Sequence, residues 1–274
     1  MTVNPHDVPV FVLCGGLGTR LKEETEYRPK PMVPIGGHPI LWHIMRSYAA
    51  HGFKRFVLCL GYKGDVIKDY FLNYHVLRSD FTIDLASNDV TTHSVDHAED
   101  WSVTLVSTGE LTMTGGRVAR AAEKFLGDAE HFAVTYGDGV TDANLAREFE
   151  YHLSHDRLGT VLGVNPPSRF GELMLERDRV TIFEEKPEFE EKWINGGYFF
   201  FRRGFREYLS TDESCVLERS PLIDLANDGH LNIYKHPGFW HCMDTQRDRD
   251  SLESMWSSGH APWVPSPNPA GANA

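Results

Sequence analysis

The sequence predicts an α/β fold, in which a mixed, mainly parallel β-sheet is flanked by helices and joined to a smaller β-rich portion. Short β-branched and aromatic runs, as at residues 10–13 and 56–60, alternate with a stretch of helical spacing at 40–48. Such alternation is typical of parallel sheets that are covered by helices on both faces. After residue 159 the pattern changes to closely spaced strands and turns, which predicts the β-rich portion.

Length and composition are compatible with one domain. Of the 274 residues, 41% are hydrophobic, which is enough for a sizeable core, and no apolar run approaches the ~18 residues of a membrane span. The N-terminus lacks the charged-then-apolar layout of a secretory signal. We expect a disordered lead at 1–8, a single Rossmann-like domain at 9–261, and a loose, proline-containing tail at 262–274.

Charge and cysteine usage narrow the class of partner. The formal net charge of −12 argues against nucleic acid and anionic membrane surfaces, and therefore favours a small molecule or a metal-bridged anion. The four cysteines have no metal or redox spacing, so reduced thiols in a cytoplasmic protein are the simplest interpretation. They are Cys14, Cys59, Cys215 and Cys242.

In the first half, the strand at 10–13 is followed by a helix at 40–48 that begins after Pro39 and ends before Gly52. We predict strands at 56–60, 81–85, 103–106 and 131–135, with helices at 65–74, from 112–117 onward, and at 144–155. The polar excursion at 87–100 carries His93 and His97, but a solvated segment or subunit contact is favoured there over a metal site. In the second half we predict strands at 160–164, 172–175, 179–183, 193–201, 231–234 and 238–243, short helices at 203–209 and 221–227, and a terminal helix at 247–257.

A glycine-rich turn at 14–20 directly follows the first strand. Glycines allow a close approach of the backbone, so that N–H groups can face an anion, and Arg20 and Lys30 add two cations nearby. The P-loop pattern fails because, counted from Gly15, Arg20 stands where its closing Gly-Lys-Ser/Thr would begin, and the dinucleotide fingerprint fails because Leu21 replaces its third glycine. The turn is therefore interpreted as a cradle for nucleotide phosphates of another kind.

Three further segments carry polar groups that could serve such a site, although each has a structural alternative. Asp138 follows the strand at 131–135, where parallel sheets hold their ligands, but it could be an ordinary turn residue. Glu185 and Lys186 could form an exposed charged turn. Asp244 could cap the terminal helix.

Together these segments resemble the sugar-1-phosphate nucleotidylyltransferases, most closely their cytidylyl branch. The resemblance extends from Phe11 to Trp263 and is carried by residues 15–21, 29–32, 39–45, 113–117, 136–138, 185–187, 194–197 and 236–240. It implies transfer of a cytidylyl group from CTP to α-D-glucose 1-phosphate, giving CDP-glucose and pyrophosphate, with Mg²⁺ as cofactor, in a homo-oligomer. Departures at Ser168, His241 and Cys242 lie near the sugar side, so they leave the identity of the sugar open.

The resemblance also implies roles for individual residues. Arg20, Lys30 and Asp138 would be catalytic, and Asp138 and Asp244 would share the Mg²⁺ that bridges the phosphates. Nucleotide binding would fall to Leu13, Gly15, Gly16, Gly18, Thr19, Thr112, Gly116 and Arg117, of which Thr112, Gly116 and Arg117 lie in the segment that reads the base. Binding of the sugar phosphate would fall to Gly171, Glu185, Lys186 and Asn195.

Three rival functions remain open from the sequence. A uridylyl- or thymidylyltransferase could use the same scaffold, and only the segment at 112–117 would differ. A non-catalytic sugar-nucleotide sensor should have lost Arg20, Lys30 or one of the two aspartates, whereas this chain keeps all four. A nicotinamide oxidoreductase is disfavoured by Leu21 in place of the third glycine.

Overall fold

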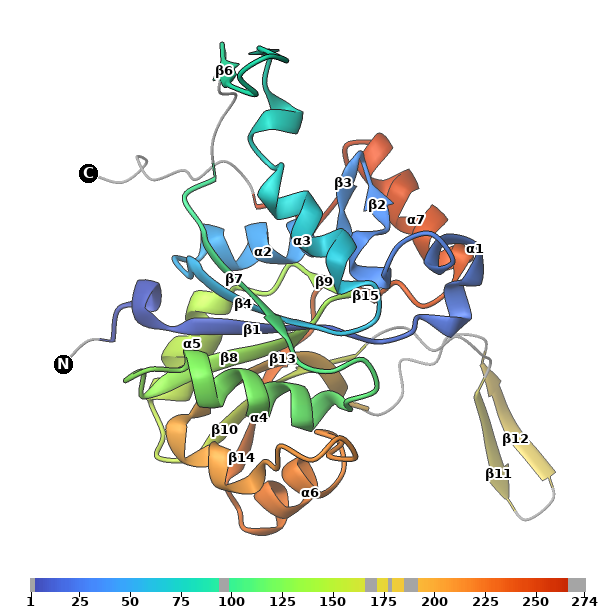
Figure 1. Ribbon diagram of the computed structural model, residues 1–274. Helices are drawn as coiled ribbons and strands as arrows, with labels where there is room; N and C mark the ends of the chain where they lie inside the picture. Colours follow the sequence, from blue (N-terminus) through green and yellow to red (C-terminus); the bar gives the residue numbers. More distant parts are fainter. Residues whose placement is uncertain (1–2, 94–98, 166–171, 177–178, 185–191, 266–274) are drawn as a thin grey trace, which may run out of the picture.

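The computed structural model describes residues 3–93, 99–165, 172–176, 179–184 and 192–265. Within these residues a seven-stranded sheet forms the centre of the molecule (Figure 1). Its strands, in spatial order, are β14 (Leu231–His236), β10 (Gly159–Val164), β13 (Ile194–Arg202), β8 (His131–Tyr136), β1 (Pro9–Cys14), β4 (Arg55–Leu60) and β7 (Ser102–Ser107).

The sheet is mixed but mainly parallel, which confirms the predicted fold class. Strands β8, β1, β4 and β7 run parallel to one another, and β10 runs parallel to β14. Strand β13 runs antiparallel to both β8 and β10. The carboxyl ends of β8, β1, β4 and β7 therefore meet at one edge, where α/β proteins place their ligands.

Helices cover both faces of the sheet (Figure 1) because side chains alternate along each strand. Val10 and Val12 point into one core, which α2 (Ile40–Ala50), α3 (Gly64–Leu72), α5 (Leu145–Leu153) and α7 (Gln246–Ser257) complete. Phe11 and Leu13 point into the other, with α4 (Thr114–Phe125) and α6 (Ser220–Asn227). Full burial of such side chains contributes about 1.5–3 kcal/mol each, so β1 is anchored from both sides.

Smaller elements surround this frame. They are α1 (Lys22–Thr25), β2 (Pro34–Ile35), β3 (His38–Pro39), β5 (Phe81–Ile83), β6 (Val90–Thr92), β9 (Gly139–Thr141), β11 (Glu172–Glu176), β12 (Arg179–Glu184), β15 (Trp240–Cys242), and 3₁₀ helices at Pro5–Asp7, Thr19–Leu21, Lys30–Met32, Val76–Arg78 and Arg203–Tyr208.

A strand that we expected in the first half of the central sheet lies outside it. We expected residues 81–85 to form the third strand, but among the described residues β5 pairs with β6 in a separate hairpin whose strand residues are all exposed. Strand β7 takes the place beside β4 instead.

Both ends of the chain are more ordered than expected where the structure describes them. Pro5–Asp7 form a 3₁₀ helix within the predicted lead, and Val8 is buried. Trp263, in the predicted loose tail, is only 3% exposed, and its indole N–H donates to His43 Nδ1 at 3.3 Å. The expectation of loose structure is therefore wrong at these positions.

Among the described residues, every helix is too short or too polar to span a lipid bilayer.

Candidate active site

A cavity of about 500 Å³ lies at the carboxyl ends of β1 and β8, beside the glycine turn. The residues that line it are Leu13, Cys14, Gly15, Gly16, Leu17, Gly18, Thr19, Lys30, Pro31, Glu110, Leu111, Thr112, Met113, Thr114, Arg117, Tyr136, Gly137 and Asp138. Most residues predicted for catalysis and nucleotide binding therefore surround one space, large enough for a small ligand.

The shape of the glycine turn is set by Gly18 and Thr25. Gly18 has φ +62°, a conformation that favours glycine, and a Cβ there would lie 2.6 Å from Thr25 Cγ2. The Thr25 hydroxyl hydrogen-bonds to the carbonyls of Gly18 (3.1 Å) and Leu21 (3.0 Å). The turn is thus closed onto the short helix α1, and its backbone can approach a ligand closely.

A second glycine brings Lys30 to the end of β8. Gly137 N–H donates to the Leu13 carbonyl at 3.1 Å, and a Cβ on Gly137 would lie 2.8 Å from Pro31 Cγ. Without that Cβ, Lys30 and Pro31 pack against the strand end that precedes Asp138. This contact places Lys30 beside a residue 108 positions away.

Asp138 and Asp244 meet because β9 and β15 pair. Gly139 and Cys242 are register partners in this antiparallel pair, and Met243 N–H donates to the Asp138 carbonyl at 2.9 Å. Thr245, not Asp244, caps α7, through a reciprocal capping box with Asp248. The alternative role of Asp244 as the helix cap is therefore wrong, and its carboxylate is available to the site.

Lys30 joins the two carboxylates. Its ammonium group lies 2.6 Å from Asp138 Oδ2 and 2.8 Å from Asp244 Oδ1, while Arg20 Nη1 lies 3.3 Å from Asp244 Oδ2. Burial would lower the pKa of Lys30, but the charge and hydrogen bonds of both aspartates outweigh it and hold that pKa above its ordinary value. The lysine is therefore a permanent cation at neutral pH.

The charge of Asp244 is equally secure. Burial would raise the pKa of this carboxyl, yet the hydrogen bond and charge of Lys30, with Arg20 nearby, hold it below its usual range. Arg20 itself points largely into solvent, with 75% of its side chain exposed. It can therefore reorient toward an anion at the mouth of the cavity.

The donor set at this point fits a hard divalent cation. Asp138, Asp244 and Cys242 each offer one atom, and the three atoms lie within 4.8 Å of one another. Burial, followed by the charge of Asp138, raises the pKa of the Cys242 thiol, so this group stays protonated. Two carboxylates beside an open cavity are what Mg²⁺ uses together with phosphate oxygens and water.

Four predicted site residues that the structure describes lie outside the cavity lining. Asp244 joins the lining through its contact with Lys30, and Arg20 through its contact with Asp244; the other two are Gly116 and Asn195. Gly116 packs inside the protein, because a Cβ there would lie 2.5 Å from the Asp212 carbonyl oxygen. Asn195 uses its side-chain oxygen to accept a hydrogen bond from Gly197 N–H at 2.8 Å. Gly171, Glu185 and Lys186 lie outside the described residues.

Arg117 reaches the cavity from beneath and not as an exposed base-reading group. Its two terminal nitrogens already donate to five oxygen atoms of the protein, and the residue is only 4% exposed. The expectation that its guanidinium reads the base is therefore not supported by its contacts. Thr112 is also buried, and its hydroxyl oxygen accepts from Arg120 at 2.8 Å.

Sequence reasoning missed a polar bridge at the cavity wall. The Tyr136 hydroxyl and the Thr114 hydroxyl both donate to the Glu218 carboxylate, Thr114 at 2.7 Å. Burial and the Glu218 charge raise the pKa of Tyr136, so it stays a neutral donor. Tyr136 could have been identified from the sequence, because it immediately precedes the Gly137-Asp138 pair. Glu218 could not, because only folding brings it to the site.

Comparison with known proteins adds independent evidence. A family model described as "Nucleotidyl transferase" matches residues 10–234. A glucose-1-phosphate cytidylyltransferase of Salmonella typhi is 47% identical over 252 residues, which cover 92% of this chain and 97% of that protein. A mannose-1-phosphate guanylyltransferase of Mycobacterium tuberculosis is 30% identical over 249 residues, covering 89% of this chain and 63% of that protein.

Among solved structures, HddC from Yersinia pseudotuberculosis superimposes with a TM-score of 0.65 at 24% identity. The match covers 91% of this chain and 99% of that chain. At this identity the likeness shows a common fold.

Proposed function

Because this chain belongs to the nucleotidyl transferase family, we propose that it transfers a cytidylyl group from CTP to α-D-glucose 1-phosphate. The products are CDP-glucose and pyrophosphate. The observation that carries the proposal is the position of Lys30 between Asp138 and Asp244 at the edge of the glycine-turn cavity. The choice of cytosine and glucose is supported by the 47% identical relative that bears the corresponding name.

The reaction needs positioning and charge neutralisation and no protein nucleophile. A phosphate oxygen of glucose 1-phosphate attacks the α-phosphorus of CTP in line, a new P–O bond forms, and the bond to the departing pyrophosphate breaks. Backbone N–H groups of the turn at 15–19 hold the nucleotide phosphates, with Leu13 beneath. Lys30 neutralises the charge that develops near the α-phosphate, and Arg20 binds the leaving pyrophosphate.

We further propose that Mg²⁺ is the cofactor and that Asp138 and Asp244 hold it. When bound, the ion supplies positive charge to the phosphate oxygens. A chelator titration tests this proposal: activity should vanish with excess EDTA and return with added Mg²⁺. Activity that survives complete chelation would overturn it.

The remaining substrate contacts are proposals that follow the family pattern. Thr112, which lines the cavity, would contact the nucleoside. Asn195 would contact the sugar hydroxyls together with Gly171, Glu185 and Lys186. Gly116 has an indirect part in this scheme, because its missing side chain lets the start of α4 pack against residue 212.

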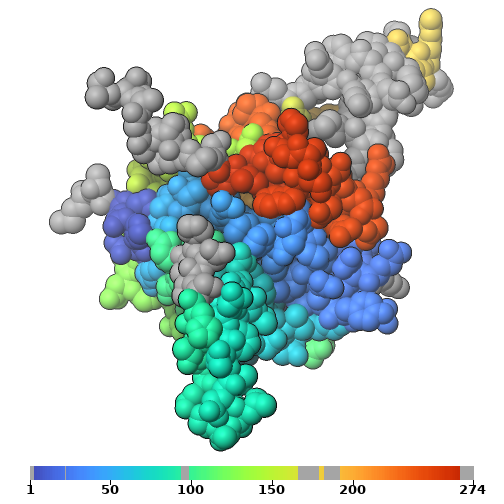
Figure 2. All heavy atoms as spheres, turned by 90° about the horizontal axis from the view of Figure 1, so that it is seen from above, coloured from blue at the N-terminus to red at the C-terminus, as the bar shows by residue number. Residues whose placement is uncertain are grey.

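A homo-oligomer is the proposed assembly, and the surface around β5 and β6 is its proposed contact. Large apolar side chains are exposed along this segment, namely Leu72, Leu77, Phe81, Ile83, Leu85 and Val90. The segment projects from the body of the molecule (Figure 2), and an isolated two-stranded hairpin is only marginally stable in water. Contact with a second copy of the chain would bury the exposed apolar side chains and stabilise the hairpin.

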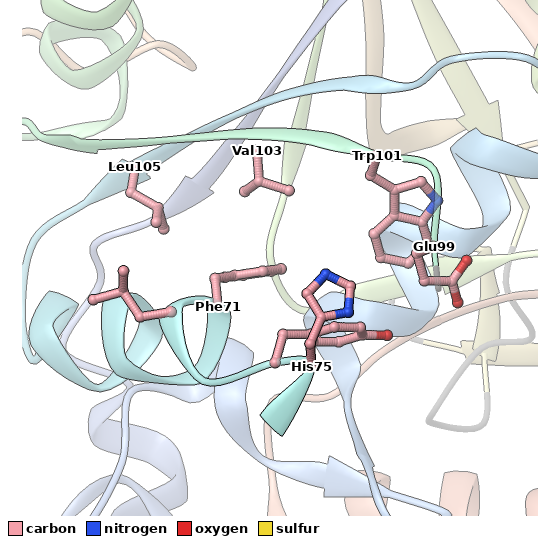
Figure 3. Close-up of a pocket in the computed structure, with 8 residues that line it drawn as sticks. Phe71, His75, Glu99, Trp101, Val103 and Leu105 are labelled. Atoms are coloured by element: carbon pink, nitrogen blue, oxygen red, sulfur yellow. The ribbon is translucent and has the colours of Figure 1, made fainter. Parts of the chain in front are cut away.

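A groove of about 290 Å³ lies beside this segment (Figure 3). Phe71 and His75 face Trp101, Val103 and Leu105 across it. Trp256 and Trp263 do not offer such a contact: Trp256 packs over Gly36, and Trp263 is buried. The assembly is therefore proposed to form on the β5–β6 side.

A cytoplasmic location is also proposed. All four cysteines are free thiols in the structure, as is usual for proteins of reducing compartments.

Pyrophosphate release, measured for four nucleoside triphosphates crossed with several sugar 1-phosphates, tests the proposed activity. We expect the highest kcat/KM with CTP and glucose 1-phosphate. A preference for UTP or dTTP would reassign the base, a preference for another hexose would reassign the sugar, and binding without turnover for every pair would favour a sensor.

A further inference from the structure

Arg117 connects the ends of three parallel strands beneath the nucleotide cavity. One terminal nitrogen donates to the carbonyls of Leu60 (3.0 Å) and Gly109 (2.7 Å) and to the Thr108 hydroxyl (2.9 Å). The other donates to the carbonyls of Gly15 (3.0 Å) and Glu110 (3.1 Å). These acceptors lie at the carboxyl end of β4 and just beyond the ends of β1 and β7, so a single side chain fixes the relative positions of three strand ends.

The surrounding backbone is shaped to admit this guanidinium. A Cβ on Gly15 would lie 2.1 Å from its central carbon, and a Cβ on Gly61 would lie 2.4 Å from one terminal nitrogen. Among the described carboxylates, none lies within ion-pair distance of Arg117. Its charge therefore rests on carbonyl dipoles at the floor of the cavity, where it also favours an anion above.

Each carbonyl that accepts from Arg117 belongs to a planar peptide unit whose N–H points the opposite way. The Gly15, Gly109 and Glu110 carbonyls are directed down to the guanidinium, so the N–H groups of Gly16, Glu110 and Leu111 are directed up. All three residues line the cavity, and within the described part of the chain none of these N–H groups donates to another protein group.

We propose that Arg117 is a positioning residue that turns the N–H groups of Gly16, Glu110 and Leu111 into the cavity as a prearranged set of donors. This inference rests on the proposed function, because the acceptors are assigned to a nucleoside triphosphate. Gly16 N–H serves a phosphate oxygen, and the N–H groups of Glu110 and Leu111 serve acceptor atoms of the nucleoside. Donors fixed before binding lose little free energy to reorganisation.

Arginine is required at this position because its planar fork offers several N–H groups in fixed directions. Lysine keeps the positive charge but presents a single ammonium group that cannot bond to the oxygens of three strand ends at once. Charge and positioning can therefore be separated by one substitution.

The test compares Arg117→Lys with the matched control Arg202→Lys. Arg202 also donates to backbone carbonyls, those of His155 and Arg157, but it ends β13 outside the cavity lining. For R117K we expect a KM for CTP, and a calorimetric Kd, about tenfold or more above wild type, the loss of one or two net hydrogen bonds. KM for glucose 1-phosphate should stay within about twofold, as should every constant of R202K.

Gly15→Ala provides a second route if R117K does not fold. Its Cβ displaces the guanidinium without changing any charge, so we expect the same selective loss of nucleotide affinity. A folded R117K or G15A protein that binds CTP as tightly as wild type would overturn the positioning role.

The calorimetry is run with whichever nucleoside triphosphate the wild type binds best. If wild type binds GTP and does not turn over CTP, the proposed function fails. The comparison of R117K with R202K, carried out with GTP, still decides the role of Arg117.

Discussion

Lys30 carries the charge balance of the candidate site. Two carboxylates converge on its ammonium group at 2.6 and 2.8 Å. Without it, Asp138 and Asp244 would repel each other in a partly buried position, and a triphosphate would add further negative charge. The residue is therefore needed before the substrate arrives and again as charge develops on the α-phosphate.

Replacing Lys30 by methionine should lower kcat by at least about 10²-fold, the scale of losing one prearranged electrostatic group. Pyrophosphate release measures the effect. Lys54→Met is the matched control and should behave like wild type, since within the described part of the chain the ion pair of Lys54 is with the exposed Asp100. Near-normal turnover by K30M would contradict the assigned role.

His43 offers a residue-scale prediction about stability and pH. Burial lowers the pKa of its imidazole to about 4, whereas the unfolded chain should show about 6.5. Between these pH values His43 is protonated in the unfolded chain and neutral in the folded protein. Stability from this group is therefore present above pH 6.5 and is lost as the pH falls toward 4, by up to about 3 kcal/mol.

Urea unfolding of wild type and His43→Gln across pH 4–8 checks this prediction, because glutamine cannot titrate there. The wild-type free energy of unfolding should fall more steeply below pH 6.5 than that of H43Q. Other buried histidines contribute equally to both proteins. Parallel curves would show that His43 does not titrate as assigned.

At the scale of elements, the β9–β15 pair matters more than its size suggests. Each of its strands has three residues, yet their register brings Asp138 and Asp244 together. Sequence reasoning placed both aspartates at strand ends and expected them to meet. It could not name the pairing, because strands this short have no pattern that selects a partner.

The β5–β6 hairpin shows that a strand can be predicted correctly while its place in the fold is not. The apolar residues at 81–85 have the composition of a strand, and a strand forms, but composition does not reveal whether a strand joins the central sheet. Here the decision is made by β7, which occupies the edge beside β4. The exposed apolar side chains of the hairpin are then available to contact a second copy of the chain.

Substitution of Leu85 by aspartate should therefore change the assembly and leave the fold intact. Leu85 is 86% exposed, so its loss should alter the free energy of unfolding by less than about 0.5 kcal/mol. Analytical ultracentrifugation should show a smaller species than wild type. Ile223→Asp, on the exposed face of α6, is the control and should not change the species; an unchanged L85D would exclude this contact.

At the scale of the whole molecule, the site depends on convergence of distant segments on one edge of the sheet. The glycine turn, Lys30 and Asp138 could be predicted from sequence because each follows a recognisable strand or carries a family pattern. The floor provided by Arg117 and the bridge through Glu218 could not, because both depend on how α4 and residues 212–218 pack against the strand ends. Such contacts have no local pattern in the sequence.

The most direct test is a crystal structure with CTP and Mn²⁺ in place of Mg²⁺, with the ion located by its anomalous scattering. The account predicts a peak in contact with carboxylate oxygens of both Asp138 and Asp244 and with phosphate oxygens of the nucleotide. A peak that touches only one aspartate, or a triphosphate bound away from the glycine turn, would contradict it.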